Sequence, residues 1–359
     1  MSEVTLKQIL ADHTIEGKLY SNLENNWITC FSCGHRCKIP PSREGICKIR
    51  FNRNGKLYVP FGYVSGIAVD PIEKKPFFHA YPGSTALSFG MLGCDYHCSF
   101  CQNWITSQTL RDPDANSTIQ IINAQEIVNL AIENGAPIIT STYNEPLITT
   151  EWSVEVFKHA KRAGLVTSYV SNGNATPEVL DYLNPWIDLY KVDLKAFQQK
   201  TYQQVGGVLQ NVLDTIRDLH ERGKWIEVVT LIIPGMNDSL EELRDIARFI
   251  FSISCNIPWH VTAYHQDYKM TTEERFTPIS TLVKAAEIGY NEGLKYVYTG
   301  NRPGQTHRYE NTYCASCNEL LIERRGFQVR QYRLHGNTCH KCGTRIAGRW
   351  KIPSSNGKE

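Results

Sequence analysis

The chain has 359 residues, of which 42% are hydrophobic and 21% are charged, and its formal net charge is +2. This length allows one large core with one or two small satellite units, and the near-neutral charge excludes an obvious polyanion binder. Residues 1–17 lack the apolar core of a signal peptide, and no apolar run approaches the ~20 residues that span a bilayer. We therefore expect a soluble cytoplasmic protein with neither a membrane nor a nucleic acid as partner.

Twelve cysteines are many for such a chain, and they are grouped. Cytosolic thiols stay reduced, so clustered cysteines indicate metal binding or catalysis before disulfides. Cys255 alone stands apart, and its apolar surroundings predict a packed small hydrophobe. The three groups are Cys30, Cys33, Cys37 and Cys47; Cys94, Cys98 and Cys101; and Cys314, Cys317, Cys339 and Cys342.

Residues 1–84 predict an N-terminal cysteine-rich extension, with short strands near residues 56–69. Its four cysteines, spaced C-x2-C-x3-C-x9-C, offer four thiolates to a metal. Zinc and a [4Fe–4S] cluster both fit this spacing, and the choice between them stays open. His35 is interpreted as a solvated loop residue, and the charged segment 70–75 as a solvated turn.

Residues 85–305 alternate short apolar runs with helical patterns, which predicts an α/β unit with parallel pairing. We favour a partial (β/α)6-type TIM barrel. A doubly wound open sheet is the alternative, because periodicity alone does not separate the two. Ser239 and Glu242 fit a capping box, and Gly164 and Gly223 fit helix C-termini. The expected strands are 85–90, 136–142, 165–170, 187–192, 225–233, 259–264 and 295–300, and the expected helices are 149–164, 211–223 and 239–253.

The central cysteines follow the first of these strands in the pattern C-x3-C-x2-C. A tight loop can bring Cys94, Cys98 and Cys101 to three corners of a cubane cluster, which leaves one iron without a protein ligand. An open iron can bind the amino and carboxylate groups of S-adenosylmethionine, and electron transfer into the sulfonium then releases a 5′-deoxyadenosyl radical. The alternatives are that the three cysteines lie together by chance, or that they form part of a zinc site. Phe100 and the strand before the loop argue against both.

Residues 306–359 predict a C-terminal zinc-ribbon-like domain, in which two C-x2-C pairs are separated by 21 residues. We favour a structural zinc ion with four thiolate ligands. An iron–sulfur cluster or no metal are the alternatives. The ligands would be Cys314, Cys317, Cys339 and Cys342. His340 is a possible competing ligand. Residues 307–359 hold ten Lys or Arg against four Glu, so this basic segment could bind RNA or an acidic partner. We favour instead a zinc ribbon that packs on the protein as a lid.

The cluster motif resembles that of the radical S-adenosylmethionine superfamily, and the order of the later motifs is similar to pyruvate formate-lyase activating enzymes. TYNEP (142–146), SNG (171–173), DLK (193–195), IPGMND (233–238) and AYHQDYKM (263–270) follow successive expected strands. One departure is Val170, where the activase has an acidic residue. The resemblance implies that cluster and cofactor are bound by Cys94, Cys98, Phe100, Cys101, Asn144, Glu145, Ser171, Asn172, Gly173, Asp193, Lys195, Pro234, Asn237 and His265.

A string of motifs over nearly the whole chain resembles the AmmeMemoRadiSam-system radical enzymes. GCDYHCSFCQNW (93–104), DPIEKKPFFHAYPGS (70–84) and YVYTGNRPG (296–304) stand among them. For segment 70–75 the resemblance implies a place lining the site, which is the alternative to a solvated turn. That family is named for occurring beside Memo-like and AMMECR-like proteins, which the resemblance makes possible partners. A low-potential electron donor such as flavodoxin or ferredoxin is also expected.

The function predicted from these patterns is a radical enzyme that cleaves S-adenosylmethionine at a [4Fe–4S] cluster and acts on an unidentified substrate. A glycyl-radical-type protein activase is the alternative within enzymes. A non-enzymatic zinc- or RNA-binding protein is the alternative in another class. Asn301 and Arg302 are expected to face the substrate, Asp193 and Lys195 either meet the cofactor or form a strand-end ion pair, and no residue is assigned a catalytic role.

Overall fold

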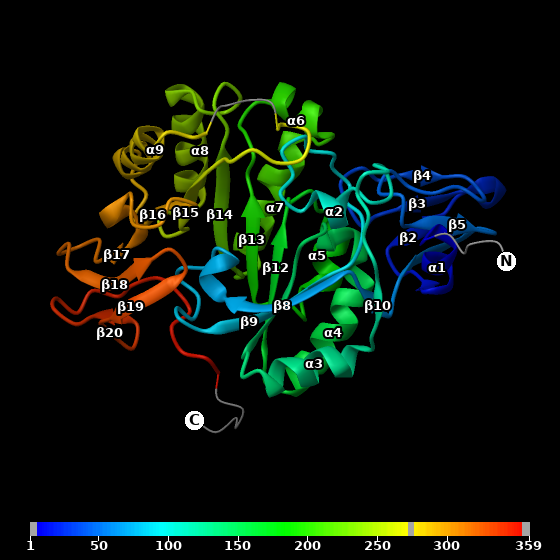
Figure 1. The fold of residues 1–359 in the computed structure, drawn as a ribbon, viewed down its shortest axis with the longest axis horizontal. Helices are drawn as coiled ribbons and strands as arrows, with labels where there is room; N and C mark the ends of the chain where they lie inside the picture. The colour runs from blue at the N-terminus through cyan, green and yellow to red at the C-terminus, as the bar shows by residue number, and fades with distance from the viewer. Residues whose placement is uncertain (1–5, 272–275, 354–359) are drawn as a thin grey trace.

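The computed structural model describes residues 6–271 and 276–353, and its centre is a sheet of eight strands (Figure 1). All seven strands expected between residues 85 and 300 are present in this sheet. The eighth strand comes from the N-terminal part of the chain. The strands are β8 (Gly66–Pro71), β9 (Thr85–Gly90), β11 (Ile138–Ser141), β12 (Val166–Ser171), β13 (Leu189–Asp193), β14 (Trp225–Ile232), β15 (Trp259–Ala263) and β16 (Val297–Gly300).

The spatial order of the strands follows the chain order from β9 to β16, with every pair parallel, and β8 adds antiparallel to β9. A doubly wound sheet reverses its strand order at a switch point. This sheet has no such reversal, so the doubly wound alternative is wrong. Among the described residues β8 and β16 are the two edges and do not pair with each other, so the sheet is open. We interpret the arrangement as a partial barrel.

Helices connect the parallel strands and cover the sheet. Helix α4 packs on β11 and β12, α7 on β14, and α9 on β15 and β16. Within the described residues, no helix is at once long and apolar enough to cross a bilayer. The helices are α1 (Leu6–Asp12), α2 (Trp104–Ser107), α3 (Ala124–Glu133), α4 (Thr150–Arg162), α5 (Pro177–Leu183), α6 (Gln199–Val205), α7 (Leu209–Glu221), α8 (Leu240–Ile253) and α9 (Ile279–Asn291).

The predicted helix ends are mostly confirmed. Gly164 and Gly223 follow α4 and α7 with φ of 74° and 71°, a left-handed conformation that glycine adopts without a steric penalty. Ser239 caps α8 by accepting a hydrogen bond from the backbone N of Glu242 at 3.2 Å. The predicted capping box is wrong in one respect: the Glu242 carboxylate does not bond back to the backbone N of Ser239. It accepts from the backbone N of Phe197 at 2.7 Å instead.

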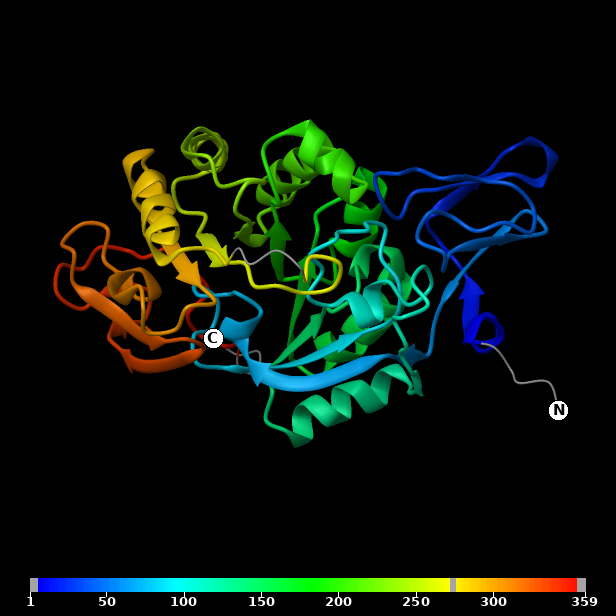
Figure 2. The ribbon, with the colours of Figure 1, turned by 45° about the horizontal axis from the view of Figure 1, so that its top comes forward.

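The N-terminal extension is built from short antiparallel strands at one end of the molecule, drawn in blue in Figures 1 and 2. Residues 66–71 belong in sequence to this expected extension, yet they pair with β9 and so extend the central sheet. The short strands are β1 (Thr14–Glu16), β2 (Tyr20–Asn22), β3 (Ile28–Cys30), β4 (Lys38–Ile39), β5 (Phe51–Arg53), β6 (Lys56–Pro60) and β7 (Tyr63–Val64), which pairs with β10 (Gln120–Ile121).

The C-terminal segment lies at the opposite end, drawn in orange to red (Figures 1 and 2). Its strands are β17 (Thr312–Tyr313), β18 (Leu320–Arg325), β19 (Gln328–Tyr332), β20 (Leu334–His335) and β21 (Thr338–Cys339). Arg324 is buried, donates to the backbone O of Phe78 at 2.7 Å, and lies over the Phe78 ring at 4.4 Å from its centroid. This arginine of the basic tail therefore anchors the segment to the body of the protein and is unavailable to an external anion.

A buried histidine joins the same two parts. His79 Nδ1 lies 2.7 Å from the backbone O of Ala347, and Nε2 lies 2.5 Å from the hydroxyl of Tyr298. The carbonyl can only accept, so Nδ1 carries a proton. Burial lowers the pKa of His79 to about 4, although the nearby Glu227 carboxylate opposes this. Arg324 and His260 add to the lowering.

We expect the free energy of unfolding to fall as the pH drops from about 6.5 to about 4. Below its ordinary pKa of 6.5, the unfolded chain protonates His79 while the folded chain does not. The difference is worth about 3 kcal/mol at the low-pH limit. Urea unfolding at pH 7 and pH 4.5 measures it, and H79Q should flatten this part of the profile. An unchanged profile in H79Q would contradict the assignment.

Candidate active site

The loop with the three central cysteines leaves the carboxyl end of β9, where barrel-type enzymes place their chemistry. Gly90 ends this strand. A Cβ at Gly90 would lie 2.3 Å from the backbone O of Thr142, so only glycine lets the loops after β9 and β11 approach this closely. Cys98 is buried, and Cys94 and Cys101 are half-buried.

These three cysteines line one cavity of about 510 Å³ at the strand ends. The cavity collects residues from loops that follow four successive strands, as the sequence analysis expected. Of the residues expected to bind cluster or cofactor, it is lined by Cys94, Cys98, Cys101, Asn144, Glu145, Ser171, Asn172, Asp193 and Lys195.

Glu145 is the most constrained carboxylate of this cavity. One oxygen accepts from the Ser171 hydroxyl at 2.7 Å and from the backbone N of Leu147 at 3.0 Å, and the other accepts from the backbone N of Asn172 at 2.7 Å. Burial, followed by the neighbouring Asp95 carboxylate, raises the pKa of Glu145 to about 8. A cationic ligand group beside Glu145 would stabilise the ionised form.

Asp95 is a site residue that the sequence analysis missed. It follows Cys94 directly, is fully buried, and accepts from the side-chain amides of Asn172 at 2.7 Å and Asn174 at 2.8 Å. These bonds tie the SNG loop to the cysteine loop. The SNG loop needs glycine at position 173, because an added Cβ there would lie 2.6 Å from the side chain of Val192. An acidic residue beside the first cluster cysteine was the available signal.

Asp193 and Lys195 point to one side of the strand end, as alternation predicts, and they form an ion pair with Nζ and Oδ2 3.3 Å apart. Lys191, which was missed, also contacts Asp193. Burial alone would raise the pKa of Asp193, but Lys191 and Lys195 outweigh it and hold that pKa at about 2. The two predicted roles, a strand-end ion pair and a place beside the cofactor, are therefore compatible. The two side chains form the ion pair and also line the cavity.

The remaining expected contacts lie outside this cavity. Pro234 and Phe100 line an adjoining hollow. The side chain of Asn237 is used to hold its own loop, donating to the backbone O of Leu231 at 2.8 Å and accepting from the backbone N of Ile233 at 2.7 Å. His265 is exposed, with its Nε2 2.9 Å from the amide nitrogen of Gln102. Their roles toward a cofactor stay predictions.

A larger hollow of about 1290 Å³ opens beyond the first and shares Cys98, Cys101, Asp193 and Lys195 with it. The segment 70–75 reaches this hollow, which corrects its interpretation as a solvated turn. Lys75 is buried and pairs with Asp70 at 3.0 Å. Arg302 is absent from its lining among the described residues. The other lining residues include Lys74, Tyr143, Val170, Val229, Leu231, Asn301 and Phe327.

The four C-terminal cysteines form a compact set whose sulfurs all lie within 4.8 Å of one another. The sulfurs of Cys314 and Cys342 are 3.6 Å apart, and those of Cys317 and Cys339 are 3.7 Å apart. Four thiolates around one zinc are separated by roughly 3.8 Å, because each Zn–S bond is about 2.3 Å long. This spacing fits one zinc ion, and we propose that the four cysteines bind it.

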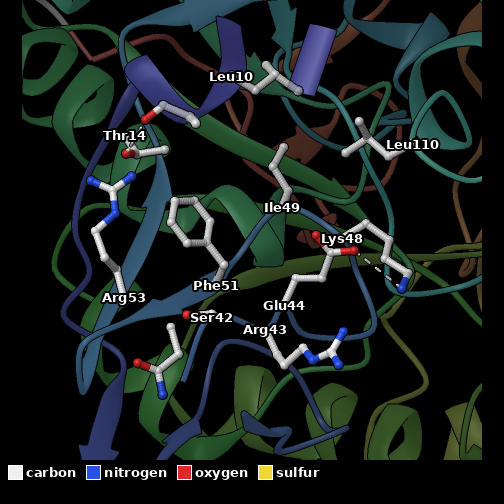
Figure 3. Close-up of a pocket in the computed structure, with 12 residues that line it drawn as sticks. Leu10, Thr14, Ser42, Arg43, Glu44, Lys48, Ile49, Phe51, Arg53 and Leu110 are labelled. Atoms are coloured by element: carbon white, nitrogen blue, oxygen red, sulfur yellow. Dashed lines mark hydrogen bonds and ion pairs between the residues drawn. The ribbon is translucent and has the colours of Figure 1, made fainter. Parts of the chain in front are cut away.

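A further hollow lies on the N-terminal extension, with Leu110 reaching it from beyond the extension (Figure 3). Leu10, Ile49 and Leu110 form its apolar part, and the pair of Lys48 and Glu44 lies on its rim with the charged atoms 3.4 Å apart. It shares no lining residue with the cavity of the three cysteines.

Comparison with known proteins gives three kinds of match. The sequence profile described as the radical SAM superfamily matches residues 90–250. An uncharacterized protein of Methanocaldococcus jannaschii is 37% identical over 335 residues, which cover 92% of this chain and 98% of that protein. The pyruvate formate-lyase-activating enzyme of Staphylococcus epidermidis is 24% identical, over 48% of this chain and 72% of that enzyme.

The isethionate sulfite-lyase activating enzyme of Oleidesulfovibrio alaskensis is 22% identical, over 54% of this chain and 64% of that enzyme. Among solved structures, Streptococcus suis SuiB bound to S-adenosylmethionine has a TM-score of 0.49 at 14% identity, covering 68% of this chain and 56% of that one. These partial matches all differ from the M. jannaschii match, which spans nearly both chains.

Proposed function

Because this chain belongs to the radical SAM superfamily, we propose that Cys94, Cys98 and Cys101 hold the [4Fe–4S] cluster at which the enzyme reductively cleaves S-adenosylmethionine. When bound, the cluster supplies the electron that breaks the sulfonium C–S bond, giving methionine and a 5′-deoxyadenosyl radical. The radical then takes a hydrogen atom from a substrate in the larger hollow. Enzyme relatives set aside the non-enzymatic zinc- or RNA-binding alternative.

The observation that carries the proposal is a cavity lined by three cysteines without a fourth among its described residues. Three thiolates fill three corners of a cubane and leave one iron for the cofactor. In the described part of the chain, only the C-terminal quartet has three or more thiols within 4.8 Å, so the central three are more widely spaced than ligands of one zinc. This wider spacing is compatible with the larger cluster.

The protein groups around the cluster fit the methionine end of the cofactor. Glu145 offers a carboxylate to the α-ammonium group, and Lys195 offers a cation to the α-carboxylate. Asp193 keeps Lys195 in place at 3.3 Å. Both roles bind and orient the cofactor, and neither moves a proton.

The substrate hollow leaves two candidates within the enzyme class. A small molecule could occupy the hollow that Lys74 and Lys75 line. The names of two relatives as activating enzymes are compatible with a glycyl-radical-type activase, in which a peptide segment of a partner protein would enter instead. We propose a flavodoxin- or ferredoxin-class electron donor and, from the family resemblance, Memo-like and AMMECR-like proteins as candidate partners.

The test is an anaerobic reaction of the iron-loaded protein with S-adenosylmethionine and dithionite. We expect methionine and 5′-deoxyadenosine in equal amounts. Intact S-adenosylmethionine after full reduction of the loaded protein would contradict the proposal. Labelled extract and neighbouring proteins would then show which molecule gives hydrogen to the adenosyl group.

For the variant E145Q we expect the KM for S-adenosylmethionine to rise about 10- to 100-fold, because a charge-assisted hydrogen bond worth about 1.5–3 kcal/mol is lost. The control is E133Q, whose glutamate is exposed at the end of α3. Iron content should be unchanged in both variants. Equal KM values for the two would remove Glu145 from the cofactor site.

A further inference from the structure

The four N-terminal cysteines gather directly behind the loop that carries Cys94. We propose that they hold a second [4Fe–4S] cluster, which accepts one electron from a ferredoxin- or flavodoxin-class donor and passes it toward the three-cysteine site. The existence of this cluster is independent of the proposed function, whereas its relay role rests on it. The four residues are Cys30, Cys33, Cys37 and Cys47.

Local structure brings these thiols together. Cys30 ends β3 and its backbone N donates to the backbone O of Cys37 at 3.0 Å, across the hairpin formed with β4. Gly45 approaches Cys37 so closely that an added Cβ would lie 3.6 Å from its sulfur, which brings in the loop of Cys47. Cys33 lies close enough to Cys30 and Cys47 for their charges, after burial and Asp95, to raise the pKa of its thiol.

The spacing of the thiols favours a cluster over a single zinc ion. A cubane holds four thiolates at the corners of a wider tetrahedron than a single zinc, because four irons and four sulfides lie between them. In the described residues, the C-terminal quartet alone gathers three or more thiols within 4.8 Å. The N-terminal set is more widely spaced, like the central cysteines that the family assigns to a cubane.

A buried arginine supplies an independent observation. Arg50 is 1% exposed, and its Nη atoms donate to Glu151 at 2.7 and 2.8 Å and to the backbone O of Ile148 at 3.0 Å. Its Nε is buried and has no partner among the described residues. Cys30 and Cys47 are near enough to interact electrostatically with this side chain. A cluster sulfur there would accept from Nε–H and remove the cost of an unpaired donor.

The two cysteine loops are in direct contact. A Cβ on Gly93, the residue before Cys94, would lie 3.3 Å from the backbone O of Cys47. The Cα atoms of Cys47 and Cys94 are therefore within roughly 11 Å, since one trans peptide step adds 3.8 Å. The His35 ring packs edge-on against Tyr96 at 6.4 Å, so this histidine lies between the loops and the solvated interpretation is corrected.

Cys47 also adjoins the protein surface. Ile46 is 40% exposed, and Lys48 lines the hollow of Figure 3. The N-terminal thiols thus lie between an outer surface and the three-cysteine loop. One electron would enter on the outer side and one would leave on the inner side, with no proton or atom transferred.

The first test counts metals in the full-length C98A variant, reconstituted anaerobically. We expect about four irons per chain, against about eight in the parent protein, together with a reducible electron paramagnetic resonance signal that S-adenosylmethionine does not change. Further substitution of the half-exposed ligand, C98A/C37S, should remove both iron and signal. Zinc in place of iron in C98A, or no metal there, would overturn the proposal.

The second test concerns the relay and uses C37S alone. We expect reduction of the remaining cluster by reduced ferredoxin to slow at least tenfold relative to the parent, with dithionite reduction affected much less. Equal slowing with both reductants would overturn the relay role. R50K, which keeps the charge and loses Nε–H, should shift the midpoint potential of the signal seen in C98A. If C98A alone left all eight irons bound, the proposed function would fail while the second cluster stood.

Discussion

C98A is expected to abolish cleavage of S-adenosylmethionine, with a loss of at least a thousandfold. Cys98 is buried between Cys94 and Cys101 in the cavity and is the proposed middle ligand, so its removal would leave two thiolates and no stable corner for the third iron. Alanine offers no oxygen that could take its place. Quantifying 5′-deoxyadenosine after anaerobic reduction measures the loss, and iron analysis should find about four irons fewer.

The matched control for this prediction is C255A. Cys255 is half-buried after α8, which differs from the packed position predicted for it, and it lines none of the cavities described above. C255A should keep both its iron and its activity. If C98A retained the activity of C255A, the cluster could not be held by these three cysteines.

C339A is expected to remove one zinc per chain and to unfold the C-terminal segment. Cys339 is 2% exposed and belongs to a core cluster with Phe78, Tyr296 and Tyr298. Because structural zinc binding is worth about 10–16 kcal/mol in small zinc units, its loss exceeds what such a small core supplies. Metal analysis, together with limited proteolysis after residue 305, measures the effect.

H340A is the control for this second prediction. His340 lies beside Cys339, and its Nε2 is 3.8 Å from a carboxylate oxygen of Glu319, outside the set of four sulfurs. We expect H340A to keep its zinc and its resistance to protease. Loss of zinc in H340A, or iron in the quartet of the parent protein, would contradict the assignment.

The local elements were readable from the sequence because they depend on periodicity and on turn chemistry. Strand β14 is an apolar run between helices, and α8 starts at a serine cap. The reciprocal half of the Ser239 box was wrong because Glu242 meets Phe197, a partner from a different loop. Neighbours distant in sequence decide such a bond, and propensity does not contain them.

The site was readable in part for the same reason. The family resemblance implied that Glu145 lies near the cysteines, and alternation along the strand end predicted the same for Lys195; both line the cavity of the three cysteines. Lys191 was missed because nothing in its local pattern separates it from an ordinary polar residue, and Asp95 was missed although it stands beside the first cluster cysteine. Their roles come from burial and from Asn172, Asn174 and Asp193, which approach only in the folded chain.

The sequence by itself determined the kind of chemistry, because three cysteines at fixed spacing after a strand leave a cubane with one open iron. It also determined the number of parallel strands and their places along the chain. Only the tertiary structure decided that the sheet is singly wound, that Arg324 and His79 join the C-terminal segment to the body of the protein, and that the C-terminal cysteines form the compact set. Sulfur-to-sulfur distances depend on how separate loops pack, and local sequence patterns do not contain that packing.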